Sequence, residues 1–420
     1  MTKKANLHFP KRFLWGAATA AHQVEGGNYN QWSVWELENA KSLAARAEYQ
    51  YGDLESWPRH QKEAKNPNNY ISGTGPDHYH RYLEDFTVLE KMGLTAFRFS
   101  IEWSRIEPKE GSWNAEAITH YKRYIAELKK RNIEPVMTLF HFTLPVWFAE
   151  MGGFEKRSNV RYFVRFVEKV MQEFGVNVRY VITLNEPEIY AANGYLHGNW
   201  PPNINNKRAF NTVLNNLAVA HNRAATAIHG MGRKYKVSVA KNSPYIYPGD
   251  DSLLSVRTAK WMQYFKDDYF LRRVVKSCDF LGVNYYFSDR VYGYRVHNPN
   301  EKVNDLGWDM QPENLQFVLE RLYAKYKLPL MITENGLADS SDESRRWWLM
   351  HTLMAMSRAH NEGVELLGYL HWSLLDNFEW DKGYWPRFGL MEIDYTTGKR
   401  KPRPSALWYA KAVKKIREDA

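Results

Sequence analysis

Two glutamates in this 420-residue chain stand directly after apolar runs, where a buried strand would end. The stretch "VITLNEPEIY", residues 181 to 190, stops on Asn185 and Glu186, and "LMITENG" stops in the same way on Glu334. A single glutamate in such a place is most simply read as a helix cap or as half of a salt bridge. Two carboxylates that faced each other across a cleft would instead suit acid/base or nucleophilic chemistry.

Other polar and aromatic side chains follow the same rule, because nearly every apolar run in the chain ends on a residue that a core would not choose. These residues are Gln23, Arg98, His141, Asn242, Asn284, Tyr286, Trp372, Glu379 and Trp380. Amide, imidazole, guanidinium and phenol groups make directional hydrogen bonds to hydroxyls, and indoles offer flat apolar faces to a sugar ring. The set therefore favours a carbohydrate ligand.

The elements that must position these residues are eight strand-like runs, separated by segments with helical periodicity such as "AITHYKRYIAELKKRN". Strand alternating with helix indicates a parallel sheet, and therefore an α/β fold. Eight such units without a linker predict a single (β/α)8 TIM barrel, so that residues 1–420 form one catalytic domain. All strand ends of such a barrel open onto one face. The runs are Phe13–Ala20, Ala96–Trp103, Pro135–Phe142, Tyr180–Leu184, Lys236–Lys241, Asp279–Tyr286, Leu328–Thr333 and Leu367–Ser373.

One segment does not fit the alternation. Residues 36–76 are predicted as a long loop after the first strand with a short helix.

Composition narrows the function classes. The formal charge of +10 is scattered and accompanies no nucleic-acid motif, so no nucleic-acid partner is expected. No apolar run approaches the length of a membrane span, and the one cysteine, Cys278, excludes an internal disulfide. With no signal-peptide pattern at the start, we expect a cytoplasmic protein.

Metal ligands are not evident. His78 and His80 in "DHYHRY" have a spacing seen in metal sites, but no acidic or cysteine partner is identifiable, so structural or solvated roles are favoured. The thiol of Cys278, at the start of a strand, is expected to be inert. The sequence predicts neither a metal site nor a cofactor.

Seven segments, in order along the chain, resemble the signature segments of glycoside hydrolase family one, the retaining β-glycosidases. They are "FLWGAATAAHQVEG", "FRFSIEWSRIEP", "TLFHFTLPVWF", "TLNEPEIY", "DFLGVNYY", "ITENGLA" and "HWSLLDNFEWDKGYWPRFGL". The resemblance runs from Phe9 to Tyr409, nearly the whole chain, and seven segments in register are far more specific than any one of them.

The resemblance implies a TIM barrel that hydrolyses small β-glycosides without a cofactor, with Glu186 as the acid/base and Glu334 as the nucleophile. It also implies that Arg98, Tyr286 and Asn284 support the nucleophile. The resemblance places Trp372 at the floor of the subsite for the terminal sugar. The other residues that it places around this sugar are Gln23, His141, Asn185, Tyr286, Glu379 and Trp380.

The departures from the family pattern concern specificity. Phe142 stands where the family often has a tryptophan, and the stretch between Asn242 and Cys278 is short, which predicts an open leaving-group side with Phe142 and Trp308 as contacts. Glu379 would repel a 6-phosphate, so plain glycosides are expected, with glucose, galactose, fucose and mannose all open. The alternative is a non-catalytic sugar-binding or scaffold protein on the same barrel. Such a protein would be expected to lose one of the two glutamates, and both are present.

Overall fold

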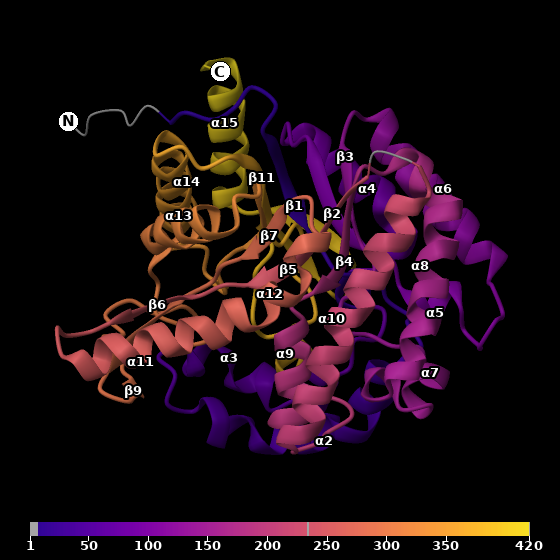
Figure 1. Cartoon of the computed structure of the whole chain (residues 1–420), viewed down its shortest axis with the longest axis horizontal. Coiled ribbons are helices and arrows are strands. Elements are labelled where there is room, and N and C mark those ends of the chain that lie inside the picture. Colours follow the sequence, from indigo (N-terminus) through magenta and orange to yellow (C-terminus); the bar gives the residue numbers. More distant parts are fainter. Residues whose placement is uncertain (1–6, 233–234, 420) are drawn as a thin grey trace.

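The computed structural model describes residues 7–232 and 235–419, and its centre is a closed barrel of parallel strands (Figure 1). Closure is direct, because the first strand pairs in parallel with both the second and the last. The predicted (β/α)8 barrel is confirmed. Around the barrel the strands are β1 (Leu14–Ala18), β2 (Ala96–Ser100), β3 (Glu134–Thr138), β4 (Tyr180–Asn185), β5 (Lys236–Asn242), β7 (Leu281–Asn284), β10 (Leu330–Asn335) and β11 (Leu366–Trp372).

Some predicted strands were too long. The run Ala96–Trp103 leaves the sheet after Ser100, because Trp103 begins the helix α5 (Trp103–Ile106), whose first turn is capped by the Glu102 side chain. The run Pro135–Phe142 likewise ends at Thr138. Apolar residues that continue past a strand pack beneath the loops, so hydrophobicity alone does not mark where the strand ends.

Successive residues of each strand pack into two different cores, as the two-residue period of a strand requires. Phe97, Met137 and Val181 belong to a large cluster shared with the helices, whereas their neighbours Ala96 and Val136 belong to a smaller cluster inside the barrel. Both faces are therefore buried, which explains the nearly continuous apolar runs in the sequence.

The long helices cover the outside of the barrel (Figure 1). In α8, for example, Tyr162, Phe163, Phe166, Val167 and Val170 recur every three or four residues and are all buried. The long helices around the barrel are α4 (His78–Lys91), α6 (Ala115–Lys130), α8 (Val160–Phe174), α10 (Lys207–Gly230), α13 (Leu315–Tyr326), α14 (Arg345–Asn361) and α15 (Pro404–Asp419), and α11 (Leu253–Gln263) extends away from it.

The prediction of a long loop over residues 36–76 was wrong. The region holds α2 (Gln31–Tyr51), α3 (Trp57–Ala64) and the 3-10 helix η1 (Pro67–Tyr70). Asn30 caps α2 through a reciprocal capping box with Ser33. Much of the buried side of α2 is alanine, and alanine adds so little hydrophobicity that the stripe is faint in the sequence.

Short elements complete the connections. Two small sheets pair β6 (Tyr245–Pro248), β8 (Ser288–Tyr292) and β9 (Arg295–Val296), and β12 (Met391–Asp394) with β13 (Lys399–Pro402). The short helices are α1 (Ala21–Val24), α7 (Val146–Glu150), α9 (Pro187–Ala191) and α12 (Tyr269–Val274). The 3-10 helices are η2 (Gly153–Glu155), η3 (Arg157–Asn159), η4 (Gly175–Asn177), η7 (Val275–Ser277), η8 (Pro312–Asn314) and η9 (Trp380–Lys382). The π-helices are η5 (Ala192–Leu196) and η6 (Tyr264–Asp268).

The stretch between Asn242 and Cys278 is short but fully folded. It holds β6, α11, η6 and α12, and in Figure 1 α11, β6 and β9 extend away from the barrel at the lower left. Within residues 7–232 and 235–419, no helix is long and apolar enough to cross a membrane.

His78 and His80 have the structural and solvated roles predicted for them, but the expectation that they lack acidic partners was wrong, because each lies beside an aspartate. His78 is buried and lies 2.7 Å from an Asp85 carboxylate oxygen, whereas His80 is exposed beside Asp77. Cys278 is buried three residues before β7 begins at Leu281, rather than opening the strand, and burial raises the pKa of its thiol to about 12. A thiol that is protonated at neutral pH is a poor nucleophile.

Candidate active site

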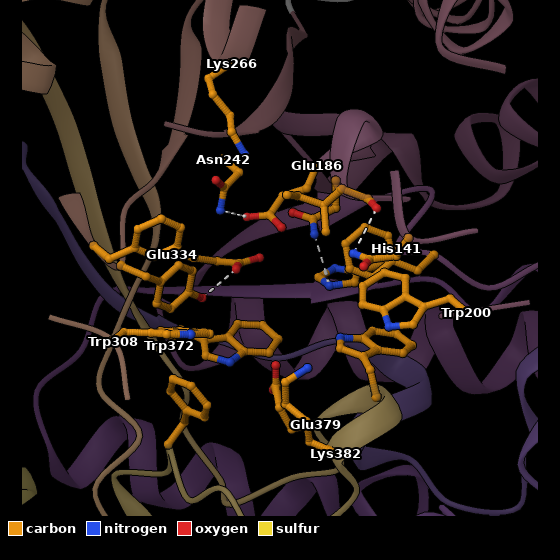
Figure 2. A pocket seen from close by; sticks show the side chains of 18 residues that line it. His141, Glu186, Trp200, Asn242, Lys266, Trp308, Glu334, Trp372, Glu379 and Lys382 are labelled. Atoms are coloured by element: carbon orange, nitrogen blue, oxygen red, sulfur yellow. Dashed lines mark hydrogen bonds between the residues drawn. The ribbon is translucent and has the colours of Figure 1, made fainter. Parts of the chain in front are cut away.

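The carboxyl ends of the barrel strands surround one cavity of about 190 Å³ (Figure 2). Its walls combine three glutamates from different parts of the chain with indoles, amides and two lysines. The lining residues are His141, Phe142, Asn185, Glu186, Ile189, Asn193, Trp200, Asn242, Lys266, Tyr286, Phe287, Trp308, Glu334, Trp372, Glu379, Trp380, Lys382 and Phe388.

Glu334, in β10, is held by a cation and a phenol. Arg98 Nη1 donates to Oε1 of Glu334 at 2.6 Å, and the Tyr286 hydroxyl donates to Oε2 at 2.7 Å. The pKa of Glu334 is raised overall, because burial outweighs Arg98 and Tyr286, which act in the opposite direction by stabilising the ionised form. Both oxygens are thus fixed, and the carboxylate keeps one orientation toward the cavity.

Glu186, directly after β4, has neutral partners only. Asn284 Nδ2 and Asn242 Nδ2 donate to its Oε1 at 2.8 and 3.2 Å. Burial, and next the negative charge of Glu334, raise the pKa of Glu186 to about 8. A carboxyl with this pKa is largely protonated at neutral pH and can give a proton away.

The two glutamates are therefore both buried in one cavity but differ in their partners, since only Glu334 is paired with a cation. Separation of the pKa values of two carboxyls by their environments is the pattern that assigns one of them as acid and the other as anionic nucleophile. Asn284 was predicted beside Glu334. Its Nδ2 donates to Glu186 Oε1 at 2.8 Å and to Asn185 Oδ1 at 3.2 Å, and its side chain also lowers the pKa of Glu334, so Asn284 lies between the two glutamates.

Arg98 also fixes the next residue of the site. Its Nη2 donates to Oδ1 of Asn185 at 2.7 Å, and Nδ2 of Asn185 lies 3.1 Å from Nε2 of His141. Burial and the Arg98 charge hold the pKa of His141 well below its usual range, so its ring is neutral. His141 Nδ1 is buried without a hydrogen-bond partner among the described residues, which leaves it available to a ligand.

The indoles of Trp372 and Trp380 flank His141. The rings of Trp372 and Trp380 lie nearly parallel to the imidazole, with interplanar angles of 17° and 16° and centroids 5.8 and 6.0 Å away. Both line the cavity, as their predicted roles as sugar contacts require, and Figure 2 labels Trp372.

Gln23 stands behind the cavity wall. Its Nε2 donates to the Phe378 carbonyl at 2.7 Å and lies 3.5 Å from Oε2 of Glu379, while its Oε1 is buried without a partner among the described residues. Gln23 therefore contacts Glu379 rather than lining the cavity itself.

Phe142 and Trp308, which were predicted as leaving-group contacts, both line the cavity. Trp308 packs against Tyr286 with ring centroids 5.9 Å apart. Phe142, Glu186 and Trp380 adopt left-handed backbone angles, with φ of 71°, 40° and 51°. Non-glycine residues rarely adopt this conformation, and such strain concentrates at functional sites.

Sequence reasoning missed several lining residues, most clearly Trp200, Asn193, Lys266 and Lys382. Lys382 lies in the quoted segment "HWSLLDNFEWDKGYWPRFGL" but was not singled out. Asn193 and Lys266 belong to the π-helices η5 and η6, which no periodicity rule detects.

In the part of the chain that the structure describes, no three His, Cys, Asp or Glu side chains gather closely enough to hold a metal ion. The donor set of the cavity is built for hydrogen bonding and proton transfer.

A TIM barrel with paired glutamates, one beside a cation and one protonated, at the carboxyl ends of β4 and β10, defines a glycoside hydrolase. The model of glycosyl hydrolase family 1 matches residues 5–278 and 271–418, so the chain belongs to this family, whose members retain the anomeric configuration.

The relatives agree with this assignment. The chain is 31% identical over 458 residues to β-glucosidase A of Thermotoga maritima, covering 97% of this chain and 98% of that one. It is 30% identical to a β-galactosidase of Sulfolobus acidocaldarius, with 96% and 94% covered. A β-glycosidase structure from Pyrococcus horikoshii superposes with a TM-score of 0.85 at 33% identity, covering 97% of this chain and 95% of that one. The alternative of a non-catalytic protein is set aside.

Proposed function

We propose that this enzyme releases non-reducing terminal β-linked sugars, with glucose as the leading candidate, from small oligosaccharides and from aryl or alkyl glycosides. A relative named a β-glucosidase supports glucose, and a relative named a β-galactosidase supports the wider class of terminal β-linked sugars. Residues 1–420 would act as one catalytic domain.

The observation that carries the assignment of roles is the contrast between the two glutamates. Glu334 receives hydrogen bonds from Arg98 and Tyr286, which favour its anionic form. Glu186 has only amide donors and a pKa of about 8. In the proposed reaction Glu334 attacks the anomeric carbon while Glu186 protonates the departing oxygen, and Glu186 then takes a proton from the water that hydrolyses the glycosyl-enzyme.

The remaining cavity residues would bind the terminal sugar. Glu379 and His141 present acceptors or donors to hydroxyls, and Trp372 offers an apolar face to the ring. Binding energy at these positions would hold the anomeric carbon near Glu334 and Glu186.

The test is a panel of 4-nitrophenyl β-glycosides of glucose, galactose, fucose and mannose with the purified protein, combined with early-time NMR of the product. We expect the β-glucoside to be cleaved with the highest kcat/KM and the β-anomer of glucose to appear first. Release of the α-anomer first would contradict the double displacement, and absence of turnover on the whole panel would refute the substrate class.

A further inference from the structure

Lys266 is a cation of the cavity that the proposed reaction leaves without a role. It lies in the π-helix η6 between α11 and α12, and its side chain reaches down toward Asn242 (Figure 2). π-Helices in proteins are frequent at functional sites, because the extra residue redirects a side chain. The other π-helix of the described residues, η5, supplies Asn193 to the same cavity.

The position of Lys266 is on the side of the acid/base. Asn242, toward which Lys266 reaches, donates to Glu186 at 3.2 Å. Figure 2 shows Lys266 at one end of the cavity and Glu379 with Lys382 at the other, with Glu186 and Glu334 between them. Because Glu186 faces the departing oxygen in the proposed function, the end beyond it receives the leaving part of the substrate.

The charge of Lys266 is not neutralised by a close carboxylate. Lys382, the other lysine of the cavity, is bonded to Asp381 at 3.0 Å, whereas Lys266 forms no ion pair within the described ranges. Lys266 lowers the pKa of Asp289, but Asp289 is itself hydrogen-bonded by Asn298, and burial raises its pKa overall. The ammonium group therefore remains available to an anion.

The other walls of the cavity include apolar and aromatic side chains that sugar hydroxyls do not need. Ile189 follows Glu186 in α9, and Phe287 and Trp308 lie with ring centroids 5.7 Å apart. Flat apolar walls with a free cation match a planar aromatic group that carries a negative charge.

We propose that Lys266 makes the enzyme select glycosides whose leaving part is an aromatic ring bearing a carboxylate. This inference rests on the proposed function and specifies its leaving-group side.

The experiment compares two matched substrates, the β-glucoside of 4-hydroxybenzoate and the β-glucoside of its methyl ester. The measured quantity is the ratio of kcat/KM for the carboxylate to kcat/KM for the ester. Wild-type protein, Lys266→Met and Lys266→Glu are compared, with Lys260→Met as the control, because Lys260 is exposed on α11 and does not line the cavity.

Exposed ion pairs contribute about 0.2–1 kcal/mol, so the ratio should fall about 1.5- to 5-fold in Lys266→Met and further in Lys266→Glu. Turnover of the ester should be retained in both. Added salt should lower the ratio in the wild type and leave it nearly unchanged in Lys266→Met, because salt screens exposed charges.

An equal change of the ratio in Lys266→Met and Lys260→Met would overturn the proposal, since it would show a general effect of net charge. An unchanged ratio in Lys266→Glu would also overturn it while leaving the proposed function intact. Failure of the wild type to hydrolyse the neutral ester would refute the proposed function, and this inference with it.

Discussion

The charge of Glu334 is expected to set much of the proton affinity of Glu186, and this coupling can be measured. Family members that retain configuration hold their carboxyls about 5–5.5 Å apart. At an effective dielectric constant of about 20, two unit charges at that distance interact by about 3 kcal/mol, which corresponds to about 2 pKa units. Replacing Glu334 by Gln should therefore lower the pKa of Glu186 from about 8 to about 6.

The pKa should not fall to the ordinary value of a glutamate, because burial is the larger cause of the shift and remains in the variant. The assay is ¹³C NMR of the protein labelled at glutamate Cδ, titrated from acid to alkaline pH, with Glu186→Gln used to assign the signal. Circular dichroism should accompany it, because Glu334→Gln leaves the buried Arg98 without its carboxylate.

Glu379→Gln is the matched control, since it also removes a cavity carboxylate that is not among the main causes of the Glu186 shift. It should leave the pKa of Glu186 near 8. The activity of the wild type gives an independent measure: Glu186 must be protonated to act as an acid, so kcat/KM should fall as the pH rises through about 8. A pKa of Glu186 that is the same in Glu334→Gln and in the wild type would refute the electrostatic reasoning.

Two further predictions concern the roles of individual groups. With azide, Glu186→Ala should release a β-glycosyl azide and Glu334→Gly an α-glycosyl azide, and the rate of Glu186→Ala should fall about 10²–10⁴-fold on alkyl glycosides but less on aryl glycosides with good leaving groups. ¹H NMR of the products identifies the anomer. The opposite pairing of variant and anomer would mean that the two roles are reversed. Lys382→Met should raise KM for β-glucosides about 5-fold near pH 9 and change it little near pH 7. Burial raises the pKa of Glu379 to about 8 although Lys382 lowers it, so Glu379 is ionised in the wild type only above pH 8, and loss of Lys382 would keep it neutral there, with hydrogen bonds weaker by about 1 kcal/mol. Initial rates across pH 6–9 measure this, Lys382→Arg should behave as wild type, and a KM in Lys382→Met equal to that of the wild type at pH 9 would contradict the coupling.

Much of the catalytic cavity was predictable because it follows from local rules. A parallel strand buried on both faces is a continuous apolar run, and its polar terminal residue is conspicuous, as at Glu186 and Glu334. A barrel then brings the strand ends together without any further information. Arg98 was predictable for the complementary reason that a guanidinium within an apolar strand needs an anion, and the structure pairs it with Glu334.

What escaped prediction depends on contacts that a linear pattern does not encode. The helix α2 buries alanines and tryptophans whose periodicity is faint, and only the Asn30–Ser33 capping box marks its start. The cytoplasmic location stays a prediction, because nothing in the fold tests it.

Lys266 and Lys382 show why specificity is harder to predict than mechanism. Both are ordinary surface-type residues in the sequence, and only the path of η6 and η9 brings them to the cavity. Their surroundings differ. Lys382 is paired with Asp381 at 3.0 Å and also lowers the pKa of the neighbouring Glu379, whereas Lys266 has no ion-pair partner in the described parts of the chain. The catalytic glutamates and Arg98 sit on rigid strands and keep one geometry. The two lysines come from connecting segments, where a change of sequence can alter which substrates bind without moving the reacting groups.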